Sequence, residues 1–273
     1  MNINVQGTLI DLSEPKVMGV LNLTPDSFYD GGSYQDLEAA IAQTARMLEE
    51  GATFIDVGAY SSRPGAQNIS AAAEEARLTP VLAELVRTFP QMIISVDTFR
   101  ASVAKKAIEA GASIVNDISA GMLDSEMMKT VGILGVPYIM MHMQGTPQTM
   151  QNATEYGVIT KEVAMYFSER INQARKYKIK DLIVDPGYGF AKTPGQSLEL
   201  LGKSDFFQNL ELPVLTGISR KSMIYKTLET KPSEALNGTT ALHMVALQKG
   251  SSILRVHDVK PAMECIKLCR SLS

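Results

Sequence analysis

The sequence predicts an α/β fold: a single (β/α)8 TIM barrel with a short N-terminal β-hairpin. Short apolar runs rich in β-branched residues alternate with longer segments of helical periodicity, and this pair of elements occurs eight times. No linker, charge run or low-complexity segment separates the pairs, so the short connections indicate a parallel sheet that closes on itself. The first pair lacks the GxGxxG fingerprint of many open, doubly wound sheets. We therefore predict one domain over residues 1–273, with the hairpin at 1–14 and the barrel at 15–273.

The eight pairs follow one another from residue 17 to the C-terminus. Strands are expected at 17–21, 54–57, 93–96, 114–115, 138–141, 182–184, 214–215 and 253–256. The helices that follow them are expected at 36–50, 70–88, 101–110, 126–134, 159–177, 196–201, 235–248 and 261–272. Gly51 and Gly111 directly follow two of these helices, which is typical of a helix C-terminus. Before the barrel, residues 2–12 alternate weakly around Gly7-Thr8, which predicts the hairpin.

The composition argues against several classes of function. With a formal net charge of -3, the chain lacks the basic character of a nucleic-acid-binding protein. Charged residues at 11, 14 and 16 interrupt the first apolar stretch, which argues against a signal peptide, and no apolar run approaches the length of a transmembrane helix. Cys265 and Cys269 lie four residues apart in a helical pattern without a histidine cluster, so they are interpreted as one helix face. We expect a reduced, cytoplasmic protein with no nucleic-acid and no membrane partner.

The stretch LIVDPGYGF, residues 182–190, contains the first candidate site residue. Its apolar run is too short for a helix and is typical of a strand buried on both faces. Asp185-Pro186-Gly187 cannot continue a central strand, so a carboxylate stands at the carboxyl end of that strand. Ligands of parallel α/β proteins bind at this edge. A single aspartate there would also suit a helix N-cap that binds no ligand.

Polar side chains follow the other strands as well. Taken singly, Asp56 and Asp117 could cap helices or hold loops, and His142 is interpreted as a hydrogen-bonded residue at the barrel top. His243, inside a helix, is given no role. Left unpaired at one mouth, such groups would cost about 1–3 kcal/mol each, so together they indicate a ligand site. The set comprises Asn22, Asp56, Arg63, Asp97, Asn116, His142, Asp185, Ser219, Arg220, Lys221, Arg255 and His257.

Two sub-sites can be separated by their chemistry. Carboxylates, an amide and one ammonium on neighbouring strands suit a flat heterocycle with adjacent N–H donors and a carbonyl, and a cationic set suits phosphate. The loops LTPDSFYDGG (23–32) and YSSRPGA (60–66) are rich in small residues and are predicted to cover a bound substrate. The first set is Asp97, Asn116, Asp185 and Lys221, and the second is Arg63, Ser219, Arg255 and His257.

Eight stretches at successive strand ends carry a resemblance to a known family. They are MGVLNLTPDSFYDGG (18–32), SSRPGA (61–66), SVDTFR (95–100), VNDISAG (115–121), MMHMQGTP (140–147), VDPGYGFAK (184–192), GISRKS (217–222) and RVHDV (255–259). Together they resemble the bacterial dihydropteroate synthases of the pterin-binding TIM-barrel superfamily over essentially the whole chain, with Ser62 in place of the family's usual threonine. The resemblance implies condensation of dihydropterin pyrophosphate with p-aminobenzoate to dihydropteroate and pyrophosphate, in folate synthesis, with Mg²⁺ as cofactor.

The resemblance also assigns roles to the matching residues. It implies that Asp185 accepts hydrogen bonds from the pterin 2-amino and ring N–H groups, and that Lys221 donates to the carbonyl side. Arg255 is implied to stack on the pterin and reach the pyrophosphate, and Asn22 to contact the pyrophosphate and ligate Mg²⁺. The other implied contacts are Asn116 and Asp97 at the ring edge, Met141 and Phe190 as pocket walls, Ser62, Arg63, Ser219 and His257 at the pyrophosphate, and Phe28, Pro64, Lys221 and Ser222 in the aminobenzoate pocket that sulfonamides occupy.

An ionisation-first route agrees with these residue types. Departure of pyrophosphate leaves a cationic methylene on the pterin, which carboxylates near the ring would stabilise. On that route no strong nucleophile is needed, and the catalytic residues are Asp97, Lys221, Arg63 and Arg255. A Schiff base at Lys221 is an alternative. We disfavour it, because a polar, aromatic-poor surround is not expected to desolvate this amine.

Two other functions and one question of assembly remain open. A methyltetrahydrofolate methyltransferase of the same superfamily shares the pterin cradle of Asp97, Asn116 and Asp185 but needs no pyrophosphate site, so the residues assigned to pyrophosphate argue against it. A non-catalytic pterin-binding paralogue should have lost loop or cation residues, and this chain retains them. Relatives are homodimers through their last helices, so we expect a homodimer by resemblance. The apolar helix face that would serve, or would equally pack on its own barrel, is Ala262, Cys265, Ile266 and Cys269.

Overall fold

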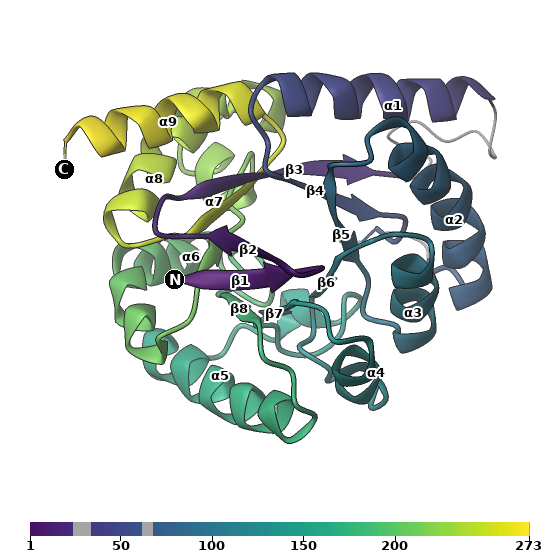
Figure 1. Cartoon of the computed structure of the whole chain (residues 1–273). Coiled ribbons are helices and arrows are strands. Elements are labelled where there is room, and N and C mark those ends of the chain that lie inside the picture. The colour runs from purple at the N-terminus through teal and green to yellow at the C-terminus, as the bar shows by residue number, and fades with distance from the viewer. Residues whose placement is uncertain (24–33, 62–67, 273) are drawn as a thin grey trace.

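The structure confirms the predicted TIM barrel. The computed structural model describes residues 1–23, 34–61 and 68–272, and in this part of the chain helices surround one sheet of eight strands (Figure 1). The strands pair in parallel in the order β8-β7-β6-β5-β4-β3-β10-β9, and a parallel bridge between Val184 and Val214 joins the two ends of this order. The strands are β3 (Lys16–Asn22), β4 (Phe54–Gly58), β5 (Ile93–Asp97), β6 (Ile114–Asp117), β7 (Tyr138–Met141), β8 (Leu182–Asp185), β9 (Leu215–Thr216) and β10 (Ile253–Val256).

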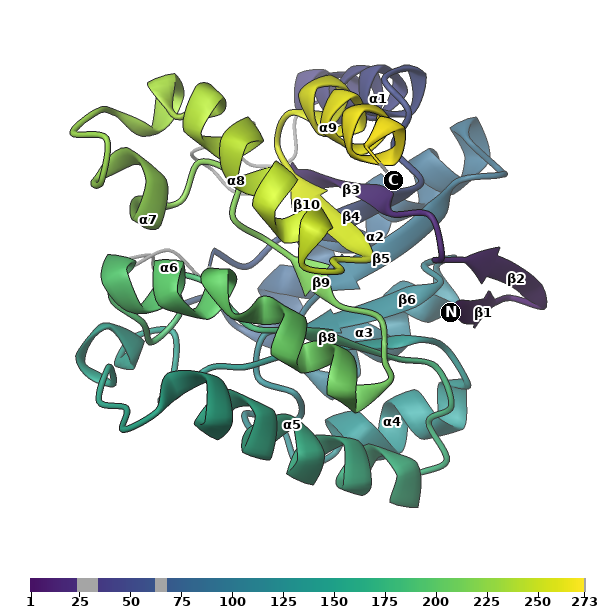
Figure 2. The same cartoon turned by 90° about the vertical axis from the view of Figure 1, so that its left-hand side faces the viewer.

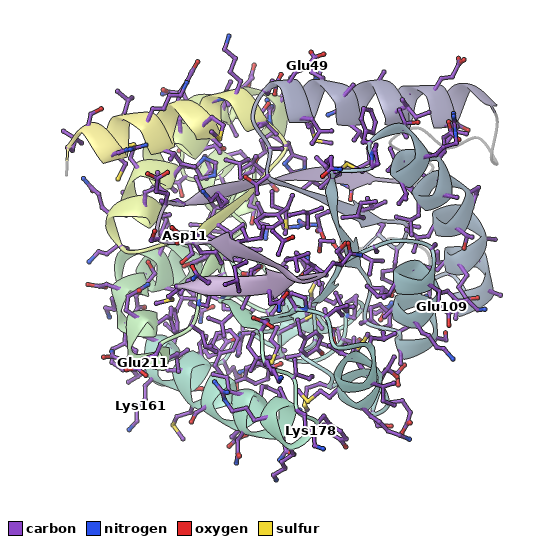
Figure 3. The ribbon with its side chains drawn as sticks, viewed as in Figure 1. Asp11, Glu49, Glu109, Lys161, Lys178 and Glu211 are labelled. Carbon is purple, nitrogen blue, oxygen red and sulfur yellow. The ribbon has the colours of Figure 1, made fainter. Side chains whose placement is uncertain are left out.

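Helices form the outer layer of the molecule (Figure 2). Charged side chains such as Glu49, Glu109 and Lys161 point outward from it (Figure 3). None of the helices in the described ranges is long and apolar enough to cross a bilayer. The helices after the strands are α1 (Tyr34–Glu49), α2 (Ala71–Thr88), α3 (Ala101–Glu109), α4 (Met127–Leu134), α5 (Ile159–Lys176), α6 (Pro194–Gly202), α8 (Leu236–Gln248) and α9 (Val259–Ser271).

Local capping explains where α6 begins. The sequence pattern places this helix at 196–201, but it starts at Pro194. The Thr193 hydroxyl accepts from the Gln196 backbone N–H at 3.2 Å, and the Gln196 side chain accepts from the Thr193 N–H at 2.8 Å. This capping box, with proline at the first helical position, fixes the start. The short helix α7 (Ser222–Tyr225) follows β9 and was not predicted, because four residues carry no periodic signal.

The N-terminal hairpin closes one end of the barrel, as Figures 1 and 2 show. Its strands β1 (Asn2–Val5) and β2 (Thr8–Asp11) pair antiparallel, as predicted. Ile3 and Val5 pack against an apolar layer inside the barrel. Nearly every strand contributes one side chain to this layer, which consists of Met18, Phe54, Ile114, Ile139, Ile183, Leu215 and Ile253.

Strand periodicity places polar groups directly beyond this apolar layer. Side chains two residues apart share one face of a strand, so Asp185 follows Ile183 and Arg255 follows Ile253 on the inside of the barrel. The intervening Val184 packs outward in the core under the helices. The same step along β4, β5, β6 and β7 leads to Asp56, Ser95, Asn116 and Met141. The end of the barrel opposite the hairpin is therefore polar.

Asp117 holds the loop that leaves β6, as one of the two sequence interpretations has it. Its carboxylate accepts from the Ser119 N–H at 2.7 Å, the Ser119 hydroxyl at 2.8 Å, the Gly121 N–H at 2.7 Å and the Tyr138 hydroxyl at 2.6 Å. Burial raises the pKa of Asp117, and these hydrogen bonds oppose the rise. Because every one of these neighbours donates, the site requires an acceptor-only side chain.

We predict that Asp117→Asn destabilises the fold more than Tyr138→Phe does. The amide presents N–H groups to at least one buried donor, which costs about 1–3 kcal/mol, whereas Tyr138→Phe removes one hydrogen bond worth about 1 kcal/mol. Urea unfolding of both variants measures the two losses. Equal losses would show that the four donors do not act on one carboxylate.

Candidate active site

Arg255 links three strand ends at the polar mouth of the barrel. Its Nε donates to Asp56 Oδ2 at 2.7 Å, and its Nη2 donates to Asp97 Oδ2 at 2.7 Å. Asn116 Nδ2 donates to the same Asp56 oxygen at 3.0 Å. Four side chains from β4, β5, β6 and β10 thus form one network. Burial alone would lower the pKa of Arg255, but the carboxylates of Asp56 and Asp97 raise it above its ordinary value.

Burial and neighbouring charges act in opposite directions on the pKa of Asp97 in this network. Burial raises its pKa to about 7, the Arg255 guanidinium lowers it, and the nearby Asp56 raises it again. The backbone register places Gly58 between Asn22 and Asp97 across three neighbouring strands. A Cβ at Gly58 would lie 3.1 Å from the Asp97 Cβ, so glycine leaves room between the two polar side chains.

Asp185 and Lys221 face one space at the mouth, next to Arg255. A Cβ placed on Gly217 would lie 3.8 Å from both Asp185 Oδ2 and Lys221 Nζ. Asp185 Oδ1 accepts from the Gly187 N–H at 2.8 Å, and Lys221 Nζ donates to the Tyr188 carbonyl at 2.8 Å. Burial raises the pKa of Asp185, and Lys221 opposes the rise. The carboxylate and the ammonium stand close enough to bind one ligand together.

The expectation that the surroundings would not desolvate Lys221 is wrong. Burial lowers the pKa of this amine to about 8, although Asp185 acts in the opposite direction. Its Nζ lies 4.6 Å from the centre of the Phe190 ring, in cation–π contact. The loop after β8 supplies this aromatic ring and the Tyr188 carbonyl, which sequence spacing did not reveal.

Ser219 and His257 lie together on the adjacent loops. The Ser219 hydroxyl accepts from the His257 backbone N–H at 3.2 Å and lies 3.1 Å from His257 Nδ1. His257 is exposed, yet partial desolvation of its ring and the charge of Arg255 lower its pKa below the ordinary value, which favours the neutral ring at pH 7. The pair offers a hydroxyl and a neutral imidazole to a ligand.

The structure corrects the inclusion of Arg220 among the cations of the mouth. Its guanidinium donates to both oxygens of Asp258, at 2.7 and 2.9 Å, and to the carbonyls of Pro232 and Ser233. With a φ of 54°, Arg220 occupies the left-handed region, which turns it away from its neighbours in the chain. Arg220 therefore ties two loops together instead of facing the ligand.

The remaining predicted residues lie in four different surroundings. Met141 is buried at the end of β7, and Ser222 begins α7 directly after Lys221. His142 is hydrogen-bonded through Nδ1 to Lys192 Nζ at 2.9 Å, as its interpretation as a barrel-top residue requires. His243 is buried, and its ring has no hydrogen-bond partner among the described residues. Four predicted residues lie outside the described ranges: Phe28, Ser62, Arg63 and Pro64.

Two contributors had no specific role in the sequence analysis. Asp56 was included in the polar set at the mouth without a place in either sub-site, and the structure shows that it receives hydrogen bonds from both Arg255 and Asn116. Its place two residues beyond an inward-facing Phe54 was a usable signal. Lys192 ends the VDPGYGFAK stretch, but no property of the sequence shows that its amine is buried.

Comparison with known proteins agrees with this geometry. The model of a family described as pterin binding enzyme matches residues 18–257. The dihydropteroate synthase of Escherichia coli is 41% identical over 270 residues, covering 98% of this chain and 95% of the relative. The chain belongs to the dihydropteroate synthase family. This membership confirms the family predicted from the strand-end motifs.

Solved structures of family members have the same fold. A Yersinia pestis dihydropteroate synthase in complex with a sulfonamide drug superposes with a TM-score of 0.93 at 37% identity, covering 100% of this chain and 99% of that one. A Xanthomonas albilineans dihydropteroate synthase with 4-aminobenzoic acid gives a TM-score of 0.92 at 36% identity, covering 99% and 97%. The likeness thus extends over the whole barrel of these family members.

We predict that Gly187→Ala disrupts the loop beside Asp185. Gly187 has a φ of 69°, and a Cβ there would lie 2.1 Å from the His142 carbonyl oxygen. The left-handed backbone alone costs a non-glycine residue about 1–2 kcal/mol, and the clash adds to it. Urea unfolding measures the loss, with Gly195→Ala as control because a Cβ there meets nothing within 4 Å. Equal stabilities of the two variants would contradict the observed loop geometry.

Proposed function

We propose that this chain condenses 6-hydroxymethyl-7,8-dihydropterin pyrophosphate with p-aminobenzoate to give 7,8-dihydropteroate and pyrophosphate. The observation that carries the proposal is the mouth itself, where Asp185 and Lys221 frame one space and Arg255 is held beside it by two carboxylates. Relatives named dihydropteroate synthase cover the whole barrel. The chain is then a transferase of folate synthesis and a target of sulfonamides.

Pterin recognition follows from the donors and acceptors of the mouth. One Asp185 oxygen is occupied by the Gly187 N–H, which orients the carboxylate and leaves Oδ2 toward the ligand space. There it accepts from the pterin 2-amino and ring N–H groups, while Lys221 donates to the ring carbonyl. Asn116 and Asp97 hold the neighbouring edge. Met141 and Phe190 form the apolar walls.

The leaving group, pyrophosphate, is expected to bind at the part of the mouth that supplies a guanidinium, a hydroxyl and an imidazole. Arg255 can reach the pyrophosphate from its place between Asp56 and Asp97, and Ser219 and His257 offer further hydrogen bonds. Ser62, Arg63 and Asn22 complete this group by family resemblance. As the C–O bond breaks, these groups stabilise charge on pyrophosphate, and the carboxylates stabilise the cationic methylene. The amine of p-aminobenzoate then attacks, in a pocket assigned to Phe28, Pro64, Lys221 and Ser222.

The donor set fits Mg²⁺ as a cofactor. Asn22 supplies a hard oxygen donor, and the missing side chain at Gly58 leaves space between it and Asp97. Mg²⁺ prefers few protein ligands together with phosphate oxygens and water. When bound, the ion would neutralise charge on the pyrophosphate. We expect EDTA to abolish turnover and added Mg²⁺ to restore it; full activity in metal-free buffer would exclude the cofactor.

Assembly and location are further parts of the proposal. The face of α9 formed by Ala262, Cys265 and Ile266, with Cys269 partly buried beside it, packs against its own barrel, which is one of the two alternatives left open from the sequence. We still infer a homodimer, which rests on family resemblance and is testable by light scattering. Cys265 and Cys269 form no disulfide, which suits a reducing cytoplasm.

An assay of pyrophosphate release separates this function from the alternatives. The proposed enzyme releases pyrophosphate from dihydropterin pyrophosphate and forms dihydropteroate when p-aminobenzoate is added. A methyltetrahydrofolate methyltransferase would transfer a methyl group instead, and a non-catalytic paralogue would bind pterin without turnover. Either of these results would refute the proposal.

We predict that Asp185→Asn and Arg63→Ala separate pterin binding from leaving-group chemistry. The amide presents a donor where the pterin also donates, so Asp185→Asn weakens pterin affinity about tenfold or more. Arg63→Ala leaves pterin affinity near wild type but lowers kcat by about 10²-fold. Calorimetry with a pterin that lacks pyrophosphate measures the affinities. Equal loss of affinity in both variants would mean that the two sub-sites are misassigned.

We also predict that pterin affinity falls as the pH rises through about 8. The pKa of Lys221 in the free protein is lowered to about 8, so above that pH binding must restore the proton that the pterin carbonyl requires. The affinity then falls by up to about tenfold per pH unit. Lys221→Met should abolish this alkaline limb. A limb that persists in Lys221→Met would show that another group titrates.

A further inference from the structure

We propose that Lys192 is a positioning residue for pterin binding. Its buried ammonium ties the end of β7 to the loop after β8, and so holds Asp185 and Lys221 at the distance from each other that pterin binding requires. The inference deepens the proposed function, because it takes the pterin as the ligand of that site. Lys192 itself lies behind the loop and is not placed against the substrate.

The surroundings of the Lys192 amine consist of acceptors. The residue is 6% exposed. Its Nζ lies 2.9 Å from His142 Nδ1, 3.0 Å from the Gly187 carbonyl oxygen and 3.1 Å from the Phe190 carbonyl oxygen, with the His142 carbonyl at 3.4 Å. Three ammonium protons match three close acceptors, whereas a neutral amine would turn its lone pair toward one of them. The arrangement is therefore built for the charged form.

Keeping the Lys192 ammonium charged in a buried site costs free energy of desolvation. Burial lowers the pKa of Lys192, and the nearby Asp185 carboxylate opposes this shift. Buried lysines are rare unless they are paired, because desolvation disfavours the ammonium. The ring of His142, which faces the Lys192 amine, also packs against the rings of Tyr166 and Tyr156. The burial lowers the pKa of the His142 ring to about 2, so the ring stays neutral and available as an acceptor.

The carbonyls that Lys192 binds belong to the residues that shape the pterin site. Gly187 directs its N–H to Asp185 Oδ1, and its carbonyl goes to Lys192. Phe190 places its ring under Lys221 Nζ, and its carbonyl goes to Lys192 as well. Between them, Tyr188 accepts from Lys221 through its own carbonyl. One ammonium thus fixes both ends of the segment that contacts Asp185 and Lys221.

Lys192→Met tests this role, because methionine has a similar length and volume but no donor. We expect the affinity for a pterin without pyrophosphate, and the KM for dihydropterin pyrophosphate, to weaken about tenfold or more. The KM for p-aminobenzoate should stay within about twofold. Lys203→Met is the matched control, because Lys203 pairs with Glu199 on the surface and its side chain is 58% exposed. It should match wild type in every measurement.

A lower melting temperature with unchanged pterin affinity in Lys192→Met would overturn the proposal, because it would reduce Lys192 to a structural role. If that variant does not fold, His142→Phe decides, since it removes one acceptor and keeps a ring; we expect about threefold weaker pterin binding, and unchanged affinity would overturn the proposal. Wild-type protein that binds no pterin would instead refute the proposed function.

Discussion

The pairing of Arg255 with two carboxylates is the interaction on which the mouth of this barrel depends. Its guanidinium lies between Asp56, whose side chain is fully buried, and Asp97, and Asp56 also binds Asn116. Removing one partner of such a buried pair typically costs about 3–5 kcal/mol, because the other charge is left uncompensated. The network therefore fixes the positions of side chains from four strands before any ligand arrives.

The charge balance of the site suits the proposed chemistry. The carboxyl groups of Asp56, Asp97 and Asp185 lie close to the two cations Lys221 and Arg255, so carboxylate oxygens stand near the space for the ligand. Such a site favours a cationic pterin methylene over a neutral one. The apolar layer below, sealed by the hairpin, keeps water from the other end of the barrel. Burial thus strengthens each of these interactions.

Much of this could be predicted from the sequence, because a strand has a period of two residues and a helix shows a periodic apolar face. Those patterns located every barrel strand, and the residues after the strands identified Asp97, Asn116, Asp185 and Arg255. Arg220 could not be placed, because its left-handed backbone turns it from the mouth to Asp258. The burial of Lys221 and Lys192 also depends on a loop whose path is decided by Gly187 and by contacts with β7, which spacing does not encode.

A secondary isotope effect tests most directly whether this network stabilises a cationic methylene. The two hydrogens on the methylene that carries pyrophosphate are replaced by deuterium, and kcat/KM for dihydropterin pyrophosphate is compared with that of the unlabelled substrate. We expect a clear normal effect, because the carbon becomes trigonal and cationic before the amine bonds to it. An effect near unity, with full turnover, would contradict it by showing that the amine attacks while pyrophosphate is still attached.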